Sequence, residues 1–277
     1  MVLGGVGKVG VLLVLSEFYD KQKRKIMDFE TLDKQMRRFE QSLDRTMLDG
    51  IYVVARLDWH GFTRLTKREM NLEKPFDVRF RDAMIVTMRH LMDCGFRMTY
   101  GYTQSDEISL LFHPLDDTFG RKERKLLSIL AAEASVAFSM FMGRPAVFDC
   151  RLVPLPKADH VVDYFRWRQE DAHRNSLNSH CYWTLRKEGL SASAAQKRMS
   201  GISNSDKNEL LFERGINYND LPLWHKRGVG VYFLDEERKG FNPKTKEETA
   251  CVRRVLHLEE ELPIGEEYSR MIKEIVN

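Results

Sequence analysis

The chain has 277 residues, with 44 Lys and Arg against 41 Asp and Glu and a formal net charge of +3. This length allows one large domain or two small ones with a genuine core, and the balanced charge excludes a simple polycation. The four cysteines form no Cys-x-x-Cys pair. We therefore expect reduced thiols in a cytoplasmic protein, without a zinc cage or a disulfide framework.

Residues 1–26 are expected to be an N-terminal extension outside the core. Residues 9–15 are apolar but too short to span a bilayer, and no signal-peptide cleavage site follows them. Residues 5–10 match G-x-G-x-x-G, but no strand precedes them, so a dinucleotide-binding turn is not favoured. We expect no membrane association, and Met27 is an alternative start.

The following segments alternate between helical and strand patterns. Residues 28–43 carry apolar side chains at helical spacing after Asp28, a plausible N-cap, and residues 51–57 form a β-branched run. A second helix is predicted over 77–94, ended by Gly95. Strands are then predicted at 96–102, 107–112 and 147–153, and a long apolar helix at 123–142.

This order, strand–helix–hairpin–helix–strand, predicts an α+β fold. Over residues 27–156 we expect a ferredoxin-like, polymerase-palm antiparallel sheet with helices on one face. Residues 157–277 are expected to complete the same domain as a mainly helical C-terminal region, with helices at 159–187, 191–199 and near 206–211. Asp206 and Glu209 fit a capping box. An edge hairpin is predicted from 229–234 and 252–258, joined by a polar loop over 235–248.

The stretch 101–112 (GYTQSDEISLLF) carries the main chemical signal. Asp106 and Glu107 stand at the predicted hairpin turn, and Asp58 ends the first strand. If the first strand lies beside the hairpin, Asp58 and Asp106 converge. Two carboxylates beside turn backbone suit Mg²⁺, which keeps waters and substrate phosphates as further ligands, and two such ions support nucleotidyl transfer. The alternative is two turn aspartates that only cap backbone amides.

Two further stretches bear on the ligand. Residues 121–125 (RKERK) place cations at the start of an apolar helix, where the helix dipole disfavours them. A triphosphate would explain that placement, and a solvated charge run is the alternative. Residues 164–183 mix aromatic and basic side chains, which suits RNA stacking and phosphate contact or, equally, a core surrounded by polar groups.

Together these motifs resemble the tRNA(His) guanylyltransferase superfamily, and more closely its bacterial and archaeal Thg1-like branch. The resemblance covers roughly residues 29 to 233. The matching motifs, in chain order, are Arg56-Leu-Asp58 with Phe62, Lys74-Pro75 with Asp77, Gln104-Ser-Asp-Glu107, Lys122 with Lys125, Trp167-Arg-Gln169 with Asp171 and His173, Asp206-Lys-Asn-Glu209, and Ile216-Asn-Tyr-Asn219.

The resemblance implies template-dependent addition of nucleotides to the 5′ end of tRNA in the 3′–5′ direction. A 5′-monophosphate would be activated with ATP, and the 3′-hydroxyl of an incoming NTP, such as GTP, would then attack it. Partners would be tRNA, nucleoside triphosphates and further copies of the chain in a homotetramer, a dimer of dimers.

The resemblance also implies roles for individual residues. Asp58, Asp106 and Glu107 would be catalytic, and two Mg²⁺ ions would be held by Asp58, Asp106 and the backbone carbonyl of Trp59. The nucleotide-binding residues would be Arg56, Phe62, Lys74, Asp77, Ser105, Lys122, Lys125, Lys207 and Asn217. The residues that bind or position tRNA would be Arg168, Asp171, His173 and Asn175.

Two departures from the family patterns affect these expectations. The eukaryotic signature His-Ile-Asn-Asn-Leu-Tyr-Asn reads His-Arg-Asn-Ser-Leu-Asn-Ser at 173–179. This favours 5′-end repair over obligatory addition of G−1 to tRNA(His). The metal loop Asp-Gly-Arg reads Asp58-Trp59-His60. Because Trp adopts a positive φ only at a cost, we hypothesise a shifted loop that uses Gly61 and binds metal more weakly.

Two other functions fit the same residues. Another palm-fold nucleotidyltransferase or a nucleotide cyclase would use the same carboxylates on NTP alone, without an RNA 5′ end. A catalytically weakened RNA-binding relative would need exposed aromatic side chains on the central strands of its sheet. The strands expected at 96–102 and 107–112 offer an ambiguous set.

Overall fold

The structure is a computed structural model that describes residues 27–61, 72–242 and 247–277. The expected extension over 1–26 and the candidate residue Phe62 lie outside these ranges. The chain divides into two compact units, Met1–Arg45 and Thr46–Asn277.

Helix α2 (Phe29–Glu40) is the described helix of the first unit. Asp28 caps it as predicted, because the Asp28 carboxylate accepts a hydrogen bond from the backbone N–H of Thr31 at 3.0 Å. Its apolar side chains, among them Phe29 and Phe39, are exposed. We expected this helix within the palm-like region from residue 27, whereas the unit that holds the sheet begins at Thr46.

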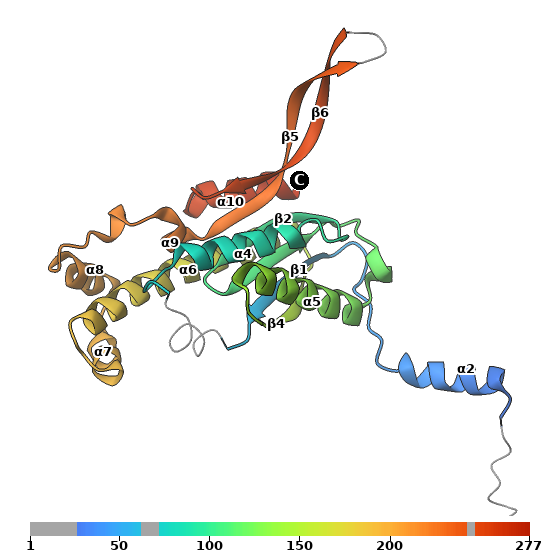
Figure 1. Cartoon of the computed structure of the whole chain (residues 1–277), viewed down its shortest axis with the longest axis horizontal. Helices are drawn as coiled ribbons and strands as arrows, with labels where there is room; N and C mark the ends of the chain where they lie inside the picture. The colour runs from blue at the N-terminus through green and yellow to red at the C-terminus, as the bar shows by residue number, and fades with distance from the viewer. Residues whose placement is uncertain (1–26, 62–71, 243–246) are drawn as a thin grey trace, which may run out of the picture. The chain divides into compact units, whose positions relative to one another are not determined.

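The second unit contains one six-stranded antiparallel sheet with the order β4-β1-β3-β2-β5-β6 (Figure 1). Its first four strands and two helices follow one another as βαββαβ, which confirms the ferredoxin-like α+β prediction. The bounds are β1 (Tyr52–Trp59), α4 (Val78–Leu91), β2 (Met98–Gln104), β3 (Glu107–Phe112), η1 (Thr118–Arg121), α5 (Glu123–Met142) and β4 (Phe148–Leu155).

Helices α4 and α5 lie side by side on one face of this sheet (Figure 1). The odd-numbered residues of β1 point to them, because side chains alternate along a strand, and Leu57 and Trp59 are buried there. By length and composition α5 would also pass as a membrane span. Its stripe of Leu126, Leu130, Ala134 and Phe138 is instead buried in this core, as in the core helix of a globular domain.

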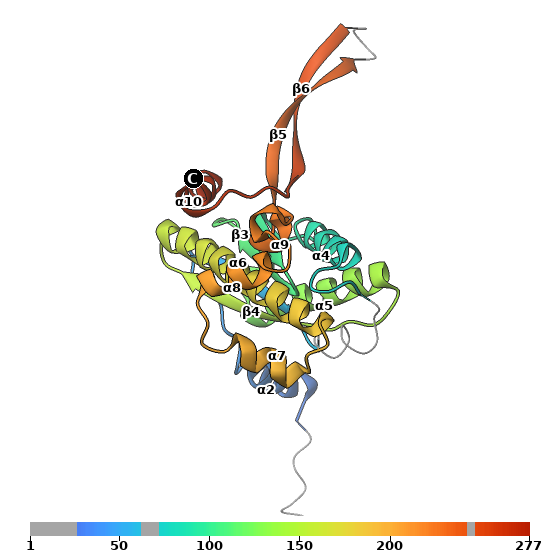
Figure 2. The ribbon, with the colours of Figure 1, turned by 90° about the vertical axis from the view of Figure 1, so that its left-hand side faces the viewer.

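The C-terminal region covers the opposite face of the sheet with α6 (Ala158–Lys187) and α10 (Gly265–Val276). Beyond the sheet, α6 continues and packs against shorter helices (Figure 2). These are α7 (Ala192–Met199), α8 (Asn204–Phe212), η2 (Tyr218–Asp220) and α9 (Leu223–Arg227). The capping box of α8 joins Ser203 to Asp206, not Asp206 to Glu209 as predicted, because the helix begins at Asn204.

Strands β5 (Val229–Asn242) and β6 (Glu247–Glu259) are much longer than predicted. The prediction of a polar loop over 235–248 is wrong. Most of these residues belong to a two-stranded ribbon that extends beyond the sheet (Figures 1 and 2). Asp235 lies opposite Arg254 and Glu236 lies opposite Arg253. Cross-strand pairs of opposite charge stabilise a ribbon that is solvated on both faces, although the same residues in sequence resemble a polar loop.

Gly228, between α9 and β5, gives a test of this packing. It has φ +71°, and a Cβ there would lie 2.6 Å from the backbone oxygen of Thr103. Gly228→Ala should lower the free energy of unfolding by several kcal/mol, because the new Cβ clashes with backbone as well as straining φ. Gly143→Ala is the matched control, with φ +65° and open space around the Cβ, and should cost about 1–2 kcal/mol. Equal losses in chemical denaturation would contradict this account.

Stability should also fall in acid because of two stacked imidazoles. The ring centres of His180 in α6 and His225 in α9 lie 5.4 Å apart, and burial lowers the pKa of each imidazole to about 4. The unfolded chain binds more protons below about pH 6.5, so the free energy of unfolding should fall by a few kcal/mol from there to about pH 4. In denaturation at several pH values, His180→Phe should flatten this fall, whereas His160→Gln at the exposed start of α6 should not.

Candidate active site

The face of β1 that packs on α6 changes from apolar to charged halfway along the strand. Tyr52 and Val54 pack against the α6 and α10 side, and the next two residues on that face are Arg56 and Asp58. In register with Asp58 stand Glu107 on β3 and Asp149 on β4. Acidic residues therefore occupy one register position on three neighbouring strands, at the end of β1.

The turn between β2 and β3 brings Asp106 to the same end. It contains Ser105 and Asp106, and Ser105 has a positive φ of 55°. The backbone N–H of Trp59 donates to the carbonyl oxygen of Asp106 at 3.2 Å, which ties the turn to the end of β1. The expected convergence of Asp58 and Asp106 is thus found in the structure.

Among the residues that the structure describes, no cation offsets the burial of either aspartate fully. Burial, together with the charge of Asp58, raises the pKa of Asp106 to about 7. Burial and the charge of Glu107 raise the pKa of Asp58, and Arg56 partly offsets this. A bound cation would remove both penalties, because a positive charge favours the ionised carboxylates.

The oxygen donors at this turn fit Mg²⁺. Among the residues that the structure describes, no three His, Cys, Asp or Glu side chains gather as a closed metal cage. Mg²⁺ does not require one, since it is commonly held by one or two carboxylates while water and phosphate fill its other positions. The oxygen atoms of Asp58, Asp106 and the Trp59 carbonyl are therefore the type of ligand that Mg²⁺ takes from a protein.

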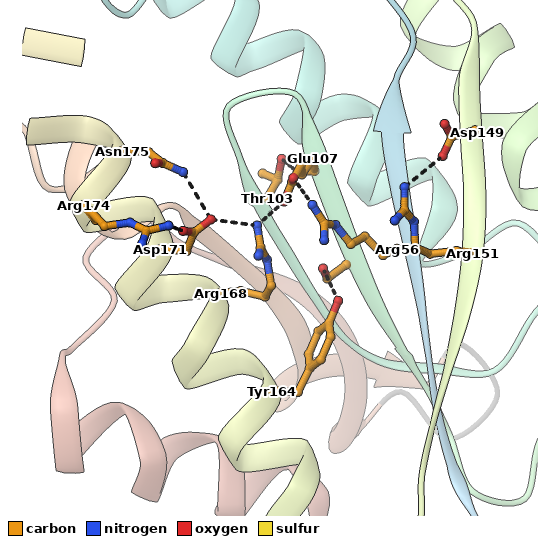
Figure 3. A network of polar contacts seen from close by, with 11 residues as sticks. Arg56, Thr103, Glu107, Asp149, Arg151, Tyr164, Arg168, Asp171, Arg174 and Asn175 are labelled. Carbon is orange, nitrogen blue, oxygen red and sulfur yellow. Dashed lines mark hydrogen bonds and ion pairs between the residues drawn. The ribbon is translucent and has the colours of Figure 1, made fainter. Parts of the chain in front are cut away.

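Glu107 is already engaged. Each of its carboxylate oxygens accepts a hydrogen bond from an arginine, one from Arg56 and the other from Arg168 (Figure 3). Asp171 lies 3.4 Å from Arg168 and also binds Arg174. Glu107, expected to be catalytic, thus anchors the turn in this structure.

A groove of about 260 Å³ opens beside the turn and runs along α6. Aromatic rings and cations line it together: the Nζ of Lys74 lies 5.7 Å from the ring centre of Trp183, and the guanidinium carbon of Arg81 lies 5.1 Å from that of Trp224. Such a wall can stack a nucleobase and attract phosphate. The lining includes Lys74, Phe76, Asp77, Arg81, Gln104, Ser105, Asp106, Glu107, Arg168, Asn175, Ser179, Trp183 and Trp224.

Asp77 shapes this wall. Its carboxylate caps α4 by accepting from the backbone N–H groups of Arg79 and Phe80, and it also accepts from that of Glu73 at 2.8 Å. Burial raises the pKa of Asp77, but the side-chain hydrogen bond from Arg79, together with these backbone bonds, lowers it overall. Asp77 therefore holds the segment that carries Lys74 in place.

Several predicted ligand residues do not reach the groove. Lys122 pairs with Thr46 beside the start of β1, and Lys125 follows one turn later. Asp58 is at the other end of β1, so the length of the strand, about 20 Å, separates it from these lysines. The structure therefore does not bring this pair to the carboxylates of its own chain. Arg121, next to them, is buried and donates to the backbone carbonyls of Met47 and Leu48.

The remaining candidates lie along the outer part of α6. The ring of His173 packs against Tyr218, and Asn217 caps η2 through the backbone N–H of Asn219. Lys207 belongs to α8. Asp171 and Asn175 bind each other at 3.1 Å, and Asn175 is the one of these that lines the groove.

Trp59 keeps strand geometry, and its indole is buried in the α4–α5 core, 5.0 Å from the ring of Phe138. The positive φ near it, 90°, falls on Gly61, as the shifted-loop hypothesis expects. Weaker metal binding stays a prediction. Trp59→Gly cannot isolate it, because removing a buried indole costs about 3–5 kcal/mol.

The residues of this region that had no predicted role include Arg81, Asp149, Arg151 and Trp224. Arg81 was one exposed position of an amphipathic helix, and Trp224 lay in an uncharacterised polar stretch. A signal for Asp149 and Arg151 was available, since they alternate along β4 as Asp58 and Arg56 do along β1.

Comparisons with known proteins identify the family. Residues 33–156 match the family model of tRNAHis guanylyltransferase, and residues 159–271 match that of the Thg1 C-terminal domain. The tRNA(His) guanylyltransferase of Neurospora crassa is 33% identical over 228 residues, which cover 78% of this chain and 77% of that protein. That of Debaryomyces hansenii is 34% identical over 219 residues, 74% of this chain and 82% of that protein.

Solved structures give the same result. A bacterial tRNA(His) guanylyltransferase-like protein in complex with ATP has a TM-score of 0.70 and 27% identity, covering 88% of this chain and 99% of that one. Its complex with GTP has a TM-score of 0.68 and 28% identity, covering 89% and 99%. The resemblance found in the sequence motifs is confirmed. The chain belongs to the tRNA(His) guanylyltransferase family of nucleotidyltransferases.

Proposed function

We propose that this protein adds nucleotides, template-dependently and in the 3′–5′ direction, to the 5′ end of tRNA. One observation carries the proposal. Asp58 and Asp106 lie close together beside an aromatic and basic groove, and burial with neighbouring negative charge raises the pKa of both, which a bound cation would reverse. Relatives named tRNA(His) guanylyltransferase and the ATP and GTP complexes of the bacterial protein support tRNA and nucleotides as substrates.

The proposed reaction has two steps. First, the 5′-monophosphate attacks the α-phosphorus of ATP, forming an adenylylated end and releasing pyrophosphate. Second, the 3′-hydroxyl of the incoming NTP attacks the activated 5′ phosphorus, and AMP leaves. Two Mg²⁺ ions held by Asp58, Asp106 and the Trp59 carbonyl would supply activation of the attacking oxygen and charge neutralisation of the leaving group.

In this proposal the groove holds the nucleotide. Lys74 supplies positive charge for its phosphates, and Trp183 and Trp224 offer faces for its base. Ser105 shapes the turn, since its positive φ allows Asp106 to approach β1. The outer turns of α6, which carry His173 and Arg174, would meet the RNA.

Assembly and location extend the proposal. A homotetramer is supported by exposed apolar side chains on α5, where Val136, Met140 and Phe141 are 56%, 79% and 47% exposed. Burial between subunits would remove this apolar surface from water. A cytoplasmic location fits the free thiols Cys94, Cys150 and Cys181.

Addition of G−1 to tRNA(His) is the second candidate, because the relatives carry that name. The two differ in substrate: repair requires a 5′-truncated tRNA and inserts the base that pairs with the template. G−1 addition requires intact tRNA(His) and inserts G alone.

The central experiment incubates the full chain with 5′-truncated tRNA, Mg²⁺, ATP and each labelled NTP. We expect extension by the nucleotide that the opposite strand specifies, and a loss of at least about 100-fold in Asp106→Asn or Asp58→Asn, because each change removes a cation ligand. Asp220→Asn, in η2, is the matched carboxylate control and should retain activity.

Three results would reject the proposal. Absence of extension from both monophosphorylated and pre-activated ends would remove 5′ addition. Product from NTP alone, without RNA, would indicate a cyclase. Full activity of Asp106→Asn would remove the metal role of that carboxylate.

Nucleotide binding in the groove is testable without catalysis. ATP or GTP should quench the fluorescence of Trp183 and Trp224, because both line the groove and a stacked base quenches an indole. Trp183→Phe and Trp224→Phe should each lose part of the quenching. Trp167→Phe, which removes a 53% exposed indole that does not line the groove, should keep it. Quenching that disappears only in Trp167→Phe would place the nucleotide elsewhere.

A further inference from the structure

Arg168 is the buried arginine of α6. It is 6% exposed, whereas Arg166 and Arg174 on the same helix are exposed. Its guanidinium donates to Glu107, lies 3.4 Å from a carboxylate oxygen of Asp171, and is 4.6 Å from the ring centre of Trp167. Two carboxylates and an aromatic face therefore already surround the group that would have to bind an RNA phosphate.

Glu107 receives a second arginine from the opposite side. Arg56 on β1 donates to one carboxylate oxygen and Arg168 on α6 donates to the other (Figure 3). Arg56 precedes Asp58 by two residues on the same face of β1, and Glu107 follows Asp106 directly. The two arginines thus connect the β2–β3 turn both to the strand that carries one aspartate and to helix α6.

We propose that Arg168 is a positioning residue for this turn: through Glu107 it fixes the Asp106 carboxylate relative to Asp58, and it does not contact RNA. The proposal rests on the function proposed above and replaces the tRNA-binding role that the family resemblance implies for Arg168. The planar guanidinium matters as well as its charge, because it reaches Glu107 and Asp171 together, which a lysine ammonium on a flexible stem does not.

The test compares Arg168→Met, Arg168→Lys and Glu107→Gln with the control Arg166→Met in the full chain. Arg166 is matched because it lies on the same helix in an exposed ion pair with Glu170 at 2.8 Å. Three readouts are needed: hydrogen exchange of peptides covering residues 103–109, the Kd for 5′-truncated tRNA, and the single-turnover rate of nucleotide addition.

In Arg168→Met we expect exchange of the turn to rise by about tenfold or more, the rate to fall by about 10- to 100-fold, and the Kd for RNA to stay within about twofold. Arg168→Lys should behave like Arg168→Met despite its charge. The double variant Arg168→Met with Glu107→Gln should be no slower than the slower single variant, because both changes break one contact. Arg166→Met should change none of the three readouts.

A different pattern overturns the proposal. An RNA Kd raised about tenfold with unchanged turn exchange would make Arg168 an RNA contact, and a full rate in Arg168→Lys would reduce its role to charge. If Arg168→Met does not fold, Arg168→Lys and Glu107→Gln give the same comparison. If the wild type adds no nucleotide, the proposed function fails, while exchange in the turn still decides whether Arg168 holds it.

Discussion

The repulsion between two partly buried aspartates is the constraint on which the site depends. Strand β1 and the β2–β3 turn are held together by backbone pairing, so Asp58 and Asp106 cannot move apart without breaking the sheet. The free energy of strand pairing thereby offsets the repulsion between two partly buried carboxylates. Such an arrangement is retained by a protein when a ligand compensates it, and the proposed Mg²⁺ ions would do so.

Helix α6 serves both the core and the site. Its first half packs Val161 and Phe165 onto the sheet, its middle supplies Arg168 to the turn, and its later turns line the groove. One rigid element therefore sets the distance between the carboxylates and the aromatic wall. The short helices packed around its far end support that wall from behind, through the stack of Phe76 on His225.

Local patterns predicted most of the fold. The apolar helical pattern in 123–142, the β-branched run at 51–57 and the strand predicted at 107–112 correspond to α5, β1 and β3. The pairing of Asp58 with Asp106 followed from topology. Local patterns did not show contacts between distant elements. The family resemblance placed Arg168 on RNA, and its contact with Glu107, 61 residues away, leaves no local signal in the sequence. Lys122 and Lys125 were assigned to the phosphate because the helix dipole indicates an anion but not which end of the sheet it occupies.

Asp58 and Trp59 are consecutive residues with opposite surroundings, one beside the site and the other in the core. A slip of β1 by one residue against β3 would drive the carboxylate into hydrocarbon and expose the indole. Burial of the Trp59 indole in the core therefore fixes the register of β1 against β3. The position of Asp58 along the edge of the sheet is then set by the hydrophobic packing of its neighbour Trp59.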